Sequence, residues 1–366
     1  MCYNYFYVAD GGEEMEAETV VRRLLDWYTL HFRALPWRQE PTPYRVWISE
    51  IMLQQTRIEA VLPYYERFMS ALPDVQALAD VPEDKLLKLW EGLGYYSRAR
   101  NLQRAAKQIV DQYGGQLPAD YDRLLALPGI GAYTAGAIAS IAYNIPVPAV
   151  DGNVMRVLAR LTGNETDVLS TAGKKCFTDL AWSLIPEEQP GRFNQALMEL
   201  GETVCLPKAQ PHCDRCPLAG QCAAFREDTA ARLPVRGAKK ARRIEHRHIA
   251  VVRIASQPPA VLLHKRPDTG LLAGLWELPN APVGMSPLPE DIVPYCTQAG
   301  ELGNCKHIFS HVEWHMTGDL FTAPSSLVCP EDYAAVSLEA LQAHYALPSA
   351  FRYYATQLPR LLEKGE

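Results

Sequence analysis

The stretch that most constrains the fold of this chain is residues 127–136, with the sequence LPGIGAYTAG. It predicts that one helix ends at Pro128, that the chain turns through Gly129 and Gly131, and that a second helix begins near Ala132. Glycines permit positive φ and close approach of another molecule, and a helix start presents unpaired N–H groups and a positive dipole end. The turn therefore suits a phosphate group, although an ordinary turn between two helices has the same pattern.

A carboxylate follows this turn, because Asp151 stands directly before the amphipathic run 154–161. An acid beside an anion-binding turn suggests chemistry on a nucleic-acid backbone. The alternative is that Asp151 only caps the helix, as aspartates commonly do.

A second acid, Glu50, lies in the apolar helical pattern VWISEIMLQQT of residues 46–56. Burial raises the pKa of a carboxylic acid, so Glu50 could stay protonated near neutral pH and act as a general acid. The alternative is a partly exposed glutamate in a salt bridge. The flanking polar side chains suit contacts with base edges and are Arg38, Gln54, Gln55 and Thr56.

Four of the nine cysteines gather between positions 205 and 222. In a reducing compartment such clustering favours a metal site over disulfides. The spacing contains one CxxC pair and fits either a [4Fe–4S] cluster or a zinc ion, and we favour the cluster because zinc ribbons usually have two such pairs. The expected ligands are Cys205, Cys213, Cys216 and Cys222.

The pattern of apolar residues divides the chain of 366 residues into a helical part and an α+β part. After a flexible leader, residues 1–17, we expect an all-α domain over 18–230, a basic linker over 231–247 and an α+β domain over 248–366. Short strands are expected at 249–254, 260–264, 274–278 and 306–321, before a helical tail. The linker could be solvated or lie on DNA.

A net charge of −6 means that local patches must carry any phosphate binding. Neither a signal peptide nor a membrane-spanning apolar run is evident, so we expect a cytoplasmic protein. We also expect it to be a monomer and to associate with the nucleoid. The turn at residues 92–101 carries Leu93 and Tyr95, which could wedge into a base stack or belong to the core.

Taken together, these motifs resemble the MutY adenine DNA glycosylases of the helix-hairpin-helix superfamily. The resemblance spans roughly residues 18 to 360 and rests on matches in one order at 35–38, 47–56, 92–96, 127–136, 150–154, 193–196, the four cysteines and 309–311. It implies a helical glycosylase domain with an iron-sulfur loop and a C-terminal MutT-like (Nudix-like) domain. It also implies excision of adenine mispaired with 8-oxoguanine or guanine in double-stranded DNA.

The resemblance implies roles for individual residues. Glu50 matches the acid that protonates adenine, Asp151 the carboxylate facing the anomeric carbon, and Tyr133 and Asn153 match residues that assist there. Gln55, Leu93 and Tyr95 match the wedge around the mispair, whereas the loop that reads 8-oxoguanine is matched by Phe309, Ser310 and His311. Whether Asp151 bonds covalently to the sugar or only stabilises its charge stays open, and the resemblance favours the covalent route.

Tyr133 separates this chain from the endonuclease III-like enzymes, which resemble it but carry a lysine there that permits strand cleavage. We therefore expect a monofunctional glycosylase that leaves an abasic site. The alternatives are an oxidised-pyrimidine glycosylase with lyase activity and a non-catalytic protein that binds damaged DNA.

Two departures from the family pattern matter. The first cysteine gap holds seven residues where the family usually has six, which puts the cluster geometry in doubt. The MutT-like domain lacks the REx2EE glutamates that hold magnesium in Nudix hydrolases, so we expect it to recognise and not to hydrolyse.

Overall fold

The computed structural model describes residues 5–6, 15–207, 211–238 and 241–363 of the chain. Most of the expected leader therefore lies outside the described residues. The chain forms two compact units, one of residues Met1–Asp80 and Asn101–Ala238 and the other of Val81–Arg100 and Lys239–Glu366. Among the described residues, no helix is both long and apolar enough to span a membrane.

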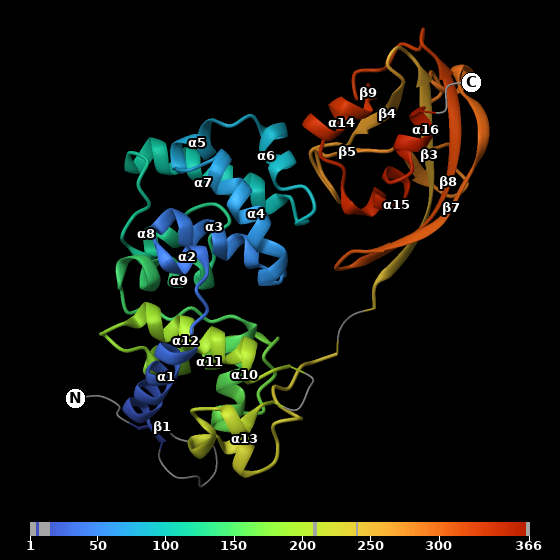
Figure 1. Ribbon diagram of the computed structural model, residues 1–366. Helices are drawn as coiled ribbons and strands as arrows, with labels where there is room; N and C mark the ends of the chain where they lie inside the picture. Colours follow the sequence, from blue (N-terminus) through green and yellow to red (C-terminus); the bar gives the residue numbers. More distant parts are fainter. Residues whose placement is uncertain (1–4, 7–14, 208–210, 239–240, 364–366) are drawn as a thin grey trace. The chain divides into compact units, whose positions relative to one another are not determined.

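The first unit is helical apart from a two-stranded pairing of β1 (Tyr5–Phe6) with β2 (Met15–Glu16). Figure 1 shows its helices in blue to yellow-green. Its α-helices are α1 (Ala17–His31), α2 (Pro36–Gln39), α3 (Pro43–Leu53), α4 (Ile58–Ala71), α5 (Val75–Asp80), α7 (Ser97–Tyr113, which begins in the other unit), α8 (Tyr121–Leu125), α9 (Ala132–Tyr143), α10 (Gly152–Thr162), α11 (Thr171–Leu184), α12 (Pro190–Thr203) and α13 (Ala223–Arg226). Two 3-10 turns, η1 (Cys213–Arg215) and η2 (Ala219–Gln221), lie in the cysteine loop.

Local signals set the helix boundaries that position the pocket. Gly131 is the N-cap of α9, which ends at Asn144 in the left-handed region. Asp151 caps α10, and Gly163, with φ 68°, ends it. These are the residue types that helix starts and ends favour, so the sequence of this region dictates where each helix begins.

The core of the first unit joins α1, α10, α11 and α12 through buried apolar side chains such as Leu24, Leu158, Phe177 and Phe193. Their spacing of three or four residues along each helix gives each an apolar stripe. Packing these stripes together holds the start of α10 beside α12, on which part of the pocket wall is built.

The second unit contains a seven-stranded sheet and short helices, which confirms the expected α+β architecture. Its strands are β3 (Arg243–Ala255), β4 (Ala260–Lys265), β5 (Trp276–Glu277), β6 (Asn280–Pro282), β7 (Thr297–Ile308), β8 (Val312–Pro324) and β9 (Tyr333–Ser337). Its helices are α6 (Glu83–Leu89), α14 (Leu338–His344), α15 (Arg352–Ala355) and α16 (Leu358–Glu363), with 3-10 turns η3 (Val293–Tyr295) and η4 (Ser349–Phe351).

The sheet has the order β5-β4-β3-β8-β7, with β6 also pairing with β3 and β9 with β4. Strand β3 runs parallel to β8, with His246 opposite His315, and antiparallel to β4. Because side chains alternate along a strand, Ile249 and Val251 enter one core, whereas Ala250 and Val252 enter a core on the other face. Helices α14, α15 and α16 cover the first of these faces (Figure 1).

Two expected boundaries differ from the observed elements. Strand β3 begins at Arg243, inside the stretch expected as linker. Residues 306–321 are not one strand but the end of β7, a turn at 309–311 and most of β8. That turn contains no glycine or proline, so the sequence pattern did not mark it.

Candidate active site

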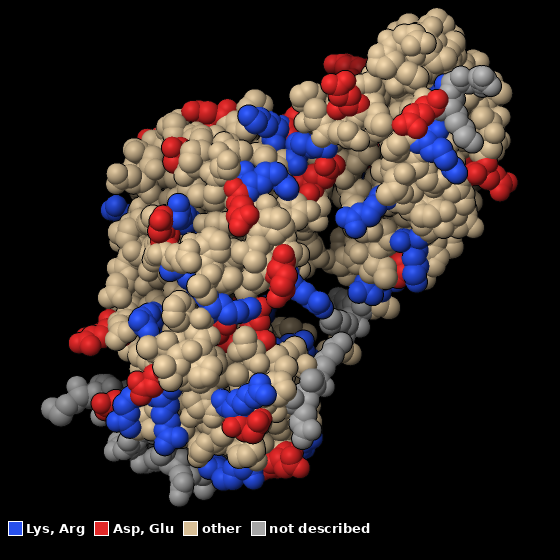
Figure 2. Space-filling view, in the orientation of Figure 1, with Lys and Arg blue, Asp and Glu red and all other residues tan. Residues whose placement is uncertain are grey.

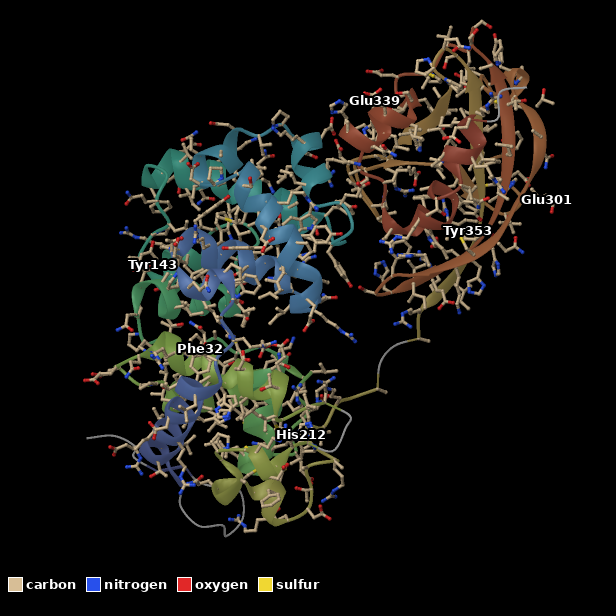
Figure 3. All side chains as sticks on the ribbon, in the orientation of Figure 1. Phe32, Tyr143, His212, Glu301, Glu339 and Tyr353 are labelled. Carbon is tan, nitrogen blue, oxygen red and sulfur yellow. The ribbon has the colours of Figure 1, made fainter. Side chains whose placement is uncertain are left out.

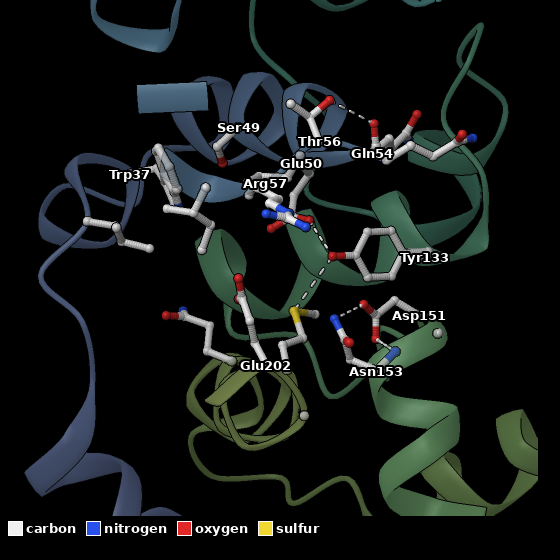
Figure 4. A pocket seen from close by; sticks show the side chains of 18 of the residues that line it. Trp37, Ser49, Glu50, Gln54, Thr56, Arg57, Tyr133, Asp151, Asn153 and Glu202 are labelled. Atoms are coloured by element: carbon white, nitrogen blue, oxygen red, sulfur yellow. Dashed lines mark hydrogen bonds between the residues drawn. The ribbon is translucent and has the colours of Figure 1, made fainter. Parts of the chain in front are cut away.

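A cavity of about 930 Å³ opens in the helical unit between α2, α3, α9, α12 and the start of α10. The four residues expected to carry the chemistry, Glu50, Tyr133, Asp151 and Asn153, all line it. Figure 4 shows their side chains pointing into one space. Two carboxyl groups from segments about a hundred residues apart therefore face a single cavity.

Glu50 lies on α3 and is only 6% exposed. The Tyr133 hydroxyl donates a hydrogen bond of 2.5 Å to its Oε2. Burial raises the pKa of Glu50 to about 7, helped by the negative charge of Asp151 and opposed by the Tyr133 hydrogen bond and by Arg38. A protonated Glu50 can accept this bond at Oε2 while its other oxygen carries the proton, so the group is set up as an acid near neutral pH.

Asp151 both caps α10 and lines the cavity. Its carboxylate accepts hydrogen bonds from the backbone N–H groups of Asn153, at 2.9 Å, and Val154, at 2.7 Å. The Asn153 side-chain amide donates a third, at 2.9 Å. Burial raises the pKa of Asp151, whereas these donors and Arg156 oppose the rise. Each donor stabilises the charged form of Asp151. The same side chain can therefore cap α10 and present a carboxylate to the cavity.

A hydrogen-bonded chain continues from Asp151 to the cysteine loop. Arg156 donates to the side-chain oxygen of Asn153 at 2.8 Å and to the carbonyl of Gly201 at 2.7 Å. Its Nε donates to the carbonyl of Cys205 at 2.8 Å. The orientation of Asn153, and through it that of Asp151, is thereby tied to the loop that carries the cysteines.

The polar residues expected around Glu50, namely Arg38, Gln54, Gln55 and Thr56, also line the cavity. Gln55 adopts φ 59°, at the irregular end of α3. Sequence reasoning missed the contribution of α12, from which Gln195, Met198 and Glu202 line the opposite wall. Residues 193–196 were among the family matches, but nothing in the sequence marked α12 as facing the site.

In the hairpin of residues 127–136, α9 begins at Ala132 as expected, whereas the preceding helix α8 ends at Leu125, before the expected Pro128. Gly129 adopts φ 76°, and a Cβ at this position would lie 2.6 Å from the Cβ of Asn101. Gly131, by contrast, has extended backbone, and a Cβ there would meet nothing within 4 Å. Gly129 is therefore required by the turn, whereas Gly131 leaves open space at the start of α9.

Of the expected wedge residues, Leu93 and Tyr95 belong to the second unit, as do the expected reading residues, whereas Gln55 belongs to the first. Tyr95 is half-exposed with φ 48°, whereas Leu93 is buried. Phe309, Ser310 and His311 form the turn between β7 and β8, where Phe309 packs edge-on against Trp314. The Tyr95 hydroxyl and the Ser310 Oγ lie 2.9 Å apart, so the turn that carries Tyr95 meets the turn between β7 and β8.

The four expected ligands, Cys205, Cys213, Cys216 and Cys222, line a small cavity of about 30 Å³ beside α10. Arg160 Nη1 lies 3.2 Å from the Cys205 sulfur. Figure 3 labels His212, the residue before Cys213 in this loop, while residues 208–210 in the long first gap lie outside the described residues.

The chemistry of these thiols suits a metal group that bridges them. Burial raises the pKa of Cys216 to about 12 and that of Cys222 to about 11, so they need a cation to become thiolates. In the described residues, no three His, Cys, Asp or Glu side chains converge as the ligands of one metal ion would.

On the face that Figure 2 shows, the described Lys and Arg side chains are mixed with Asp and Glu side chains. This mixture agrees with the modest net charge of −6. Contacts with a polyanion would depend on particular groups such as the hairpin and not on a broad field.

Comparison with known proteins agrees with this architecture. Residues 48–185 match the model of the HhH-GPD superfamily of base excision DNA repair proteins, and residues 250–357 match that of the NUDIX domain. Among solved structures, a thermostable thymine-DNA glycosylase is similar with a TM-score of 0.53 and 27% identity, covering 58% of this chain and 97% of that one. The expected fold class is confirmed.

Among curated relatives, the adenine DNA glycosylase of Mus musculus is 37% identical, covering 79% of this chain and 68% of its own. That of Schizosaccharomyces pombe is 31% identical, covering 90% of this chain and 87% of its own. The resemblance inferred from the motifs is confirmed: the chain belongs to the family of adenine DNA glycosylases.

Proposed function

We propose that this protein is a monofunctional glycosylase of base excision repair that removes adenine mispaired with 8-oxoguanine or guanine from double-stranded DNA. The observation that carries the proposal is the pair of carboxyl groups, Glu50 and Asp151, facing one cavity with different hydrogen-bond partners. Burial raises the pKa of Glu50, which favours its protonated form. Asp151 accepts three N–H hydrogen bonds, which favour its ionised form.

The reaction requires the adenine nucleotide to leave the base stack and enter the cavity, because a stacked base cannot reach these acids. Adenine leaves poorly as an anion. Protonation of its ring by Glu50 makes it a neutral leaving group, and breaking the bond to the base leaves the sugar with oxocarbenium character. Asp151 then stabilises that charge or bonds to the sugar before water completes the hydrolysis, as in glycoside hydrolysis.

Tyr133 and Asn153 orient these two groups, through the hydrogen bonds to Glu50 and Asp151 respectively. Tyr133 has no amine that could form a Schiff base with the sugar, so the product is an intact strand with an abasic site. This separates the proposed activity from that of a glycosylase with lyase activity.

For the cysteine loop we propose a [4Fe–4S] cluster held by Cys205, Cys213, Cys216 and Cys222. The cavity that the four cysteines share, and the single CxxC pair where zinc ribbons usually have two, support the cluster over a zinc ion. When bound, the cluster would supply a structural link across the loop. The residues of this chain that connect the loop with the pocket are Arg156 and Asn153.

For the second unit we propose recognition of 8-oxoguanine by the turn of Phe309, Ser310 and His311, with Tyr95 beside it. The hydrogen bond between Tyr95 and Ser310 supports a shared surface. Arg38, Gln54, Gln55, Thr56, Gly129 and Gly131 are proposed to contact DNA around the flipped nucleotide, with Leu93 supporting the wedge turn.

The experiment is an excision assay on duplexes carrying adenine opposite 8-oxoguanine, opposite guanine and opposite thymine, with and without alkali. Strand breaks that need alkali, and that require a mispaired adenine, support the proposal. Cleavage without alkali would indicate lyase activity, and binding without product would indicate a damage-binding protein. Either result would contradict the proposal.

A further inference from the structure

A group of charges lies at the wall of the cavity, and its buried carboxylate, Glu199, has been given no role in the chemistry proposed above. Glu199 on α12 has a side chain only 1% exposed, and its carboxylate forms ion pairs with two arginines. Arg33 Nε donates to its Oε1 at 2.5 Å, and Arg38 Nη2 reaches its Oε2 at 2.8 Å. Such a carboxylate is costly to bury unless it is paired, so both ion pairs are needed to keep it there.

Arg38 connects this group with the cavity. Its side chain is 11% exposed, lines the cavity and lies 5.8 Å above the ring of Tyr28. The hydroxyl of Tyr28 in turn donates to Gln195, which lines the cavity from α12. The guanidinium is therefore fixed from one side by a carboxylate and from another by an aromatic ring.

The groups that face Glu50 come from every wall of the cavity. The charged and titratable side chains that line the cavity with Glu50 are Arg38 from α2, Arg57 before α4, Glu59 from α4, Tyr133 from α9, Asp151 and Arg156 at the start of α10, and Glu202 from α12. Arg38 acts directly on Glu50, because its positive charge opposes the rise in the pKa of that acid. A closer approach of Arg38 to Glu50 would therefore lower the pKa of Glu50 further and favour loss of its proton.

We propose that Glu199 is a positioning residue that holds the Arg38 guanidinium in the cavity wall and so prevents it from pairing with Glu50. The inference rests on the proposed function, in which Glu50 is the general acid. Without Glu199, the buried guanidinium of Arg38 would lose its carboxylate partner. The ionised carboxylate of Glu50, across the cavity, would then be the partner available to it. A Glu50 paired in this way could not donate a proton to adenine.

The test is the pH dependence of single-turnover excision by the full chain on the duplex with adenine opposite 8-oxoguanine. Glu199→Gln should move the alkaline fall in rate to lower pH by about 1 unit or more, since an opposite charge within contact distance lowers a carboxyl pKa by about 1–3 units. At the acid end of the profile the rate should change little. Glu199→Asp, which keeps the charge, should restore most of the wild-type profile.

Glu202→Gln is the matched control, because it removes one negative charge from the same helix. Glu202 pairs with Arg33, at 2.7 Å, and its side chain is 38% exposed. The fall in rate should therefore move less than in Glu199→Gln. An equal movement would overturn the inference, because the effect would then be one of general charge and not of Arg38.

Arg38→Met provides a second test of the role of Glu199. Removing the cation should move the fall in rate to higher pH, and adding Glu199→Gln to this variant should cause no further shift to lower pH. If Glu199→Gln alone does not fold, as judged by circular dichroism, Arg38→Met and Glu199→Asp still test the inference. A profile of Arg38→Met at or below the wild-type position would overturn it.

These outcomes separate the inference from the proposed function. Wild-type protein that excises no adenine contradicts the proposed function. Active wild-type protein together with a folded Glu199→Gln variant of unchanged pH profile contradicts only the role of Glu199.

Discussion

The catalytic cavity and the reading turn are built in opposite ways. In the cavity, Glu50 is buried, and Asp151 is bound by three N–H donors. In the turn between β7 and β8, Ser310 and its neighbours lie at the end of two strands, and its described side-chain partner is the Tyr95 hydroxyl. Chemistry needs shifted pKa values and fixed geometry, which burial supplies, whereas reading a base needs exposed donors.

This difference has a measurable consequence. Changes to the two carboxyl groups of the cavity, Glu50 and Asp151, should reduce the excision rate by large factors without weakening DNA binding. Changes in the turn should alter the choice of the opposite base by small factors while leaving the chemistry intact.

The largest effect is expected for Glu50→Gln. It keeps the size of the side chain but cannot donate an acidic proton, so the single-turnover excision rate should fall about 10²- to 10⁴-fold, the range that general acid catalysis supplies. Affinity for the mispaired duplex, measured by gel shift, should be retained. A variant with wild-type turnover would remove Glu50 from the reaction.

Asp151→Asn should have the next largest effect. Asparagine caps helices as well as aspartate does, so the melting temperature should stay close to that of the wild type. The lost negative charge should nevertheless slow excision about 10²-fold or more, because stabilisation of a developing charge is usually worth that much. A stable variant with unimpaired excision would reduce Asp151 to a helix cap.

In the reading turn, Ser310→Ala combined with His311→Ala should reduce the preference for adenine opposite 8-oxoguanine over adenine opposite guanine. Loss of one or two hydrogen bonds predicts about a 3- to 10-fold change in the ratio of excision rates. Ser256→Ala is a control on the same unit, since its exposed hydroxyl bonds to the nearby carbonyl of Pro258, away from the turn. An unchanged ratio in the double variant would exclude the turn from lesion reading.

The smallest effect concerns the hairpin. Gly129→Ala should lower the free energy of unfolding by about 1–2 kcal/mol, because alanine is strained at φ 76° and its Cβ would meet Asn101. Gly131→Ala is the matched control and should leave stability nearly unchanged, since a Cβ there meets nothing. Equal unfolding midpoints of the two variants in urea would contradict this account of the turn.

The sequence predicted those parts of the site that local patterns specify. A glycine turn before α9 and an aspartate before α10 are signals read within a few residues, and the structure has both helix starts where they were expected. Burial of Glu50 followed from the apolar neighbours on its own helix.

What could not be predicted depends on contacts between distant segments. Arg33 and Glu199 are 166 residues apart, and neither belongs to a periodic or spaced motif that would pair them. The inclusion of residues 81–100 in the second unit is of the same kind, with the Glu91 carboxylate accepting from the Leu347 N–H at 2.7 Å. Such pairings arise only when the chain is packed.

The central claim is that Glu50 holds a proton near neutral pH, and difference infrared spectra test it most directly. Spectra of the wild type minus Glu50→Gln, recorded from about pH 5 to about pH 9, isolate the carboxyl band of this residue. We predict a protonated carboxylic acid band that disappears with a midpoint at about 7, the raised pKa that burial gives Glu50. A Glu50 already ionised at about pH 5, close to the value of an ordinary glutamate, would contradict the account.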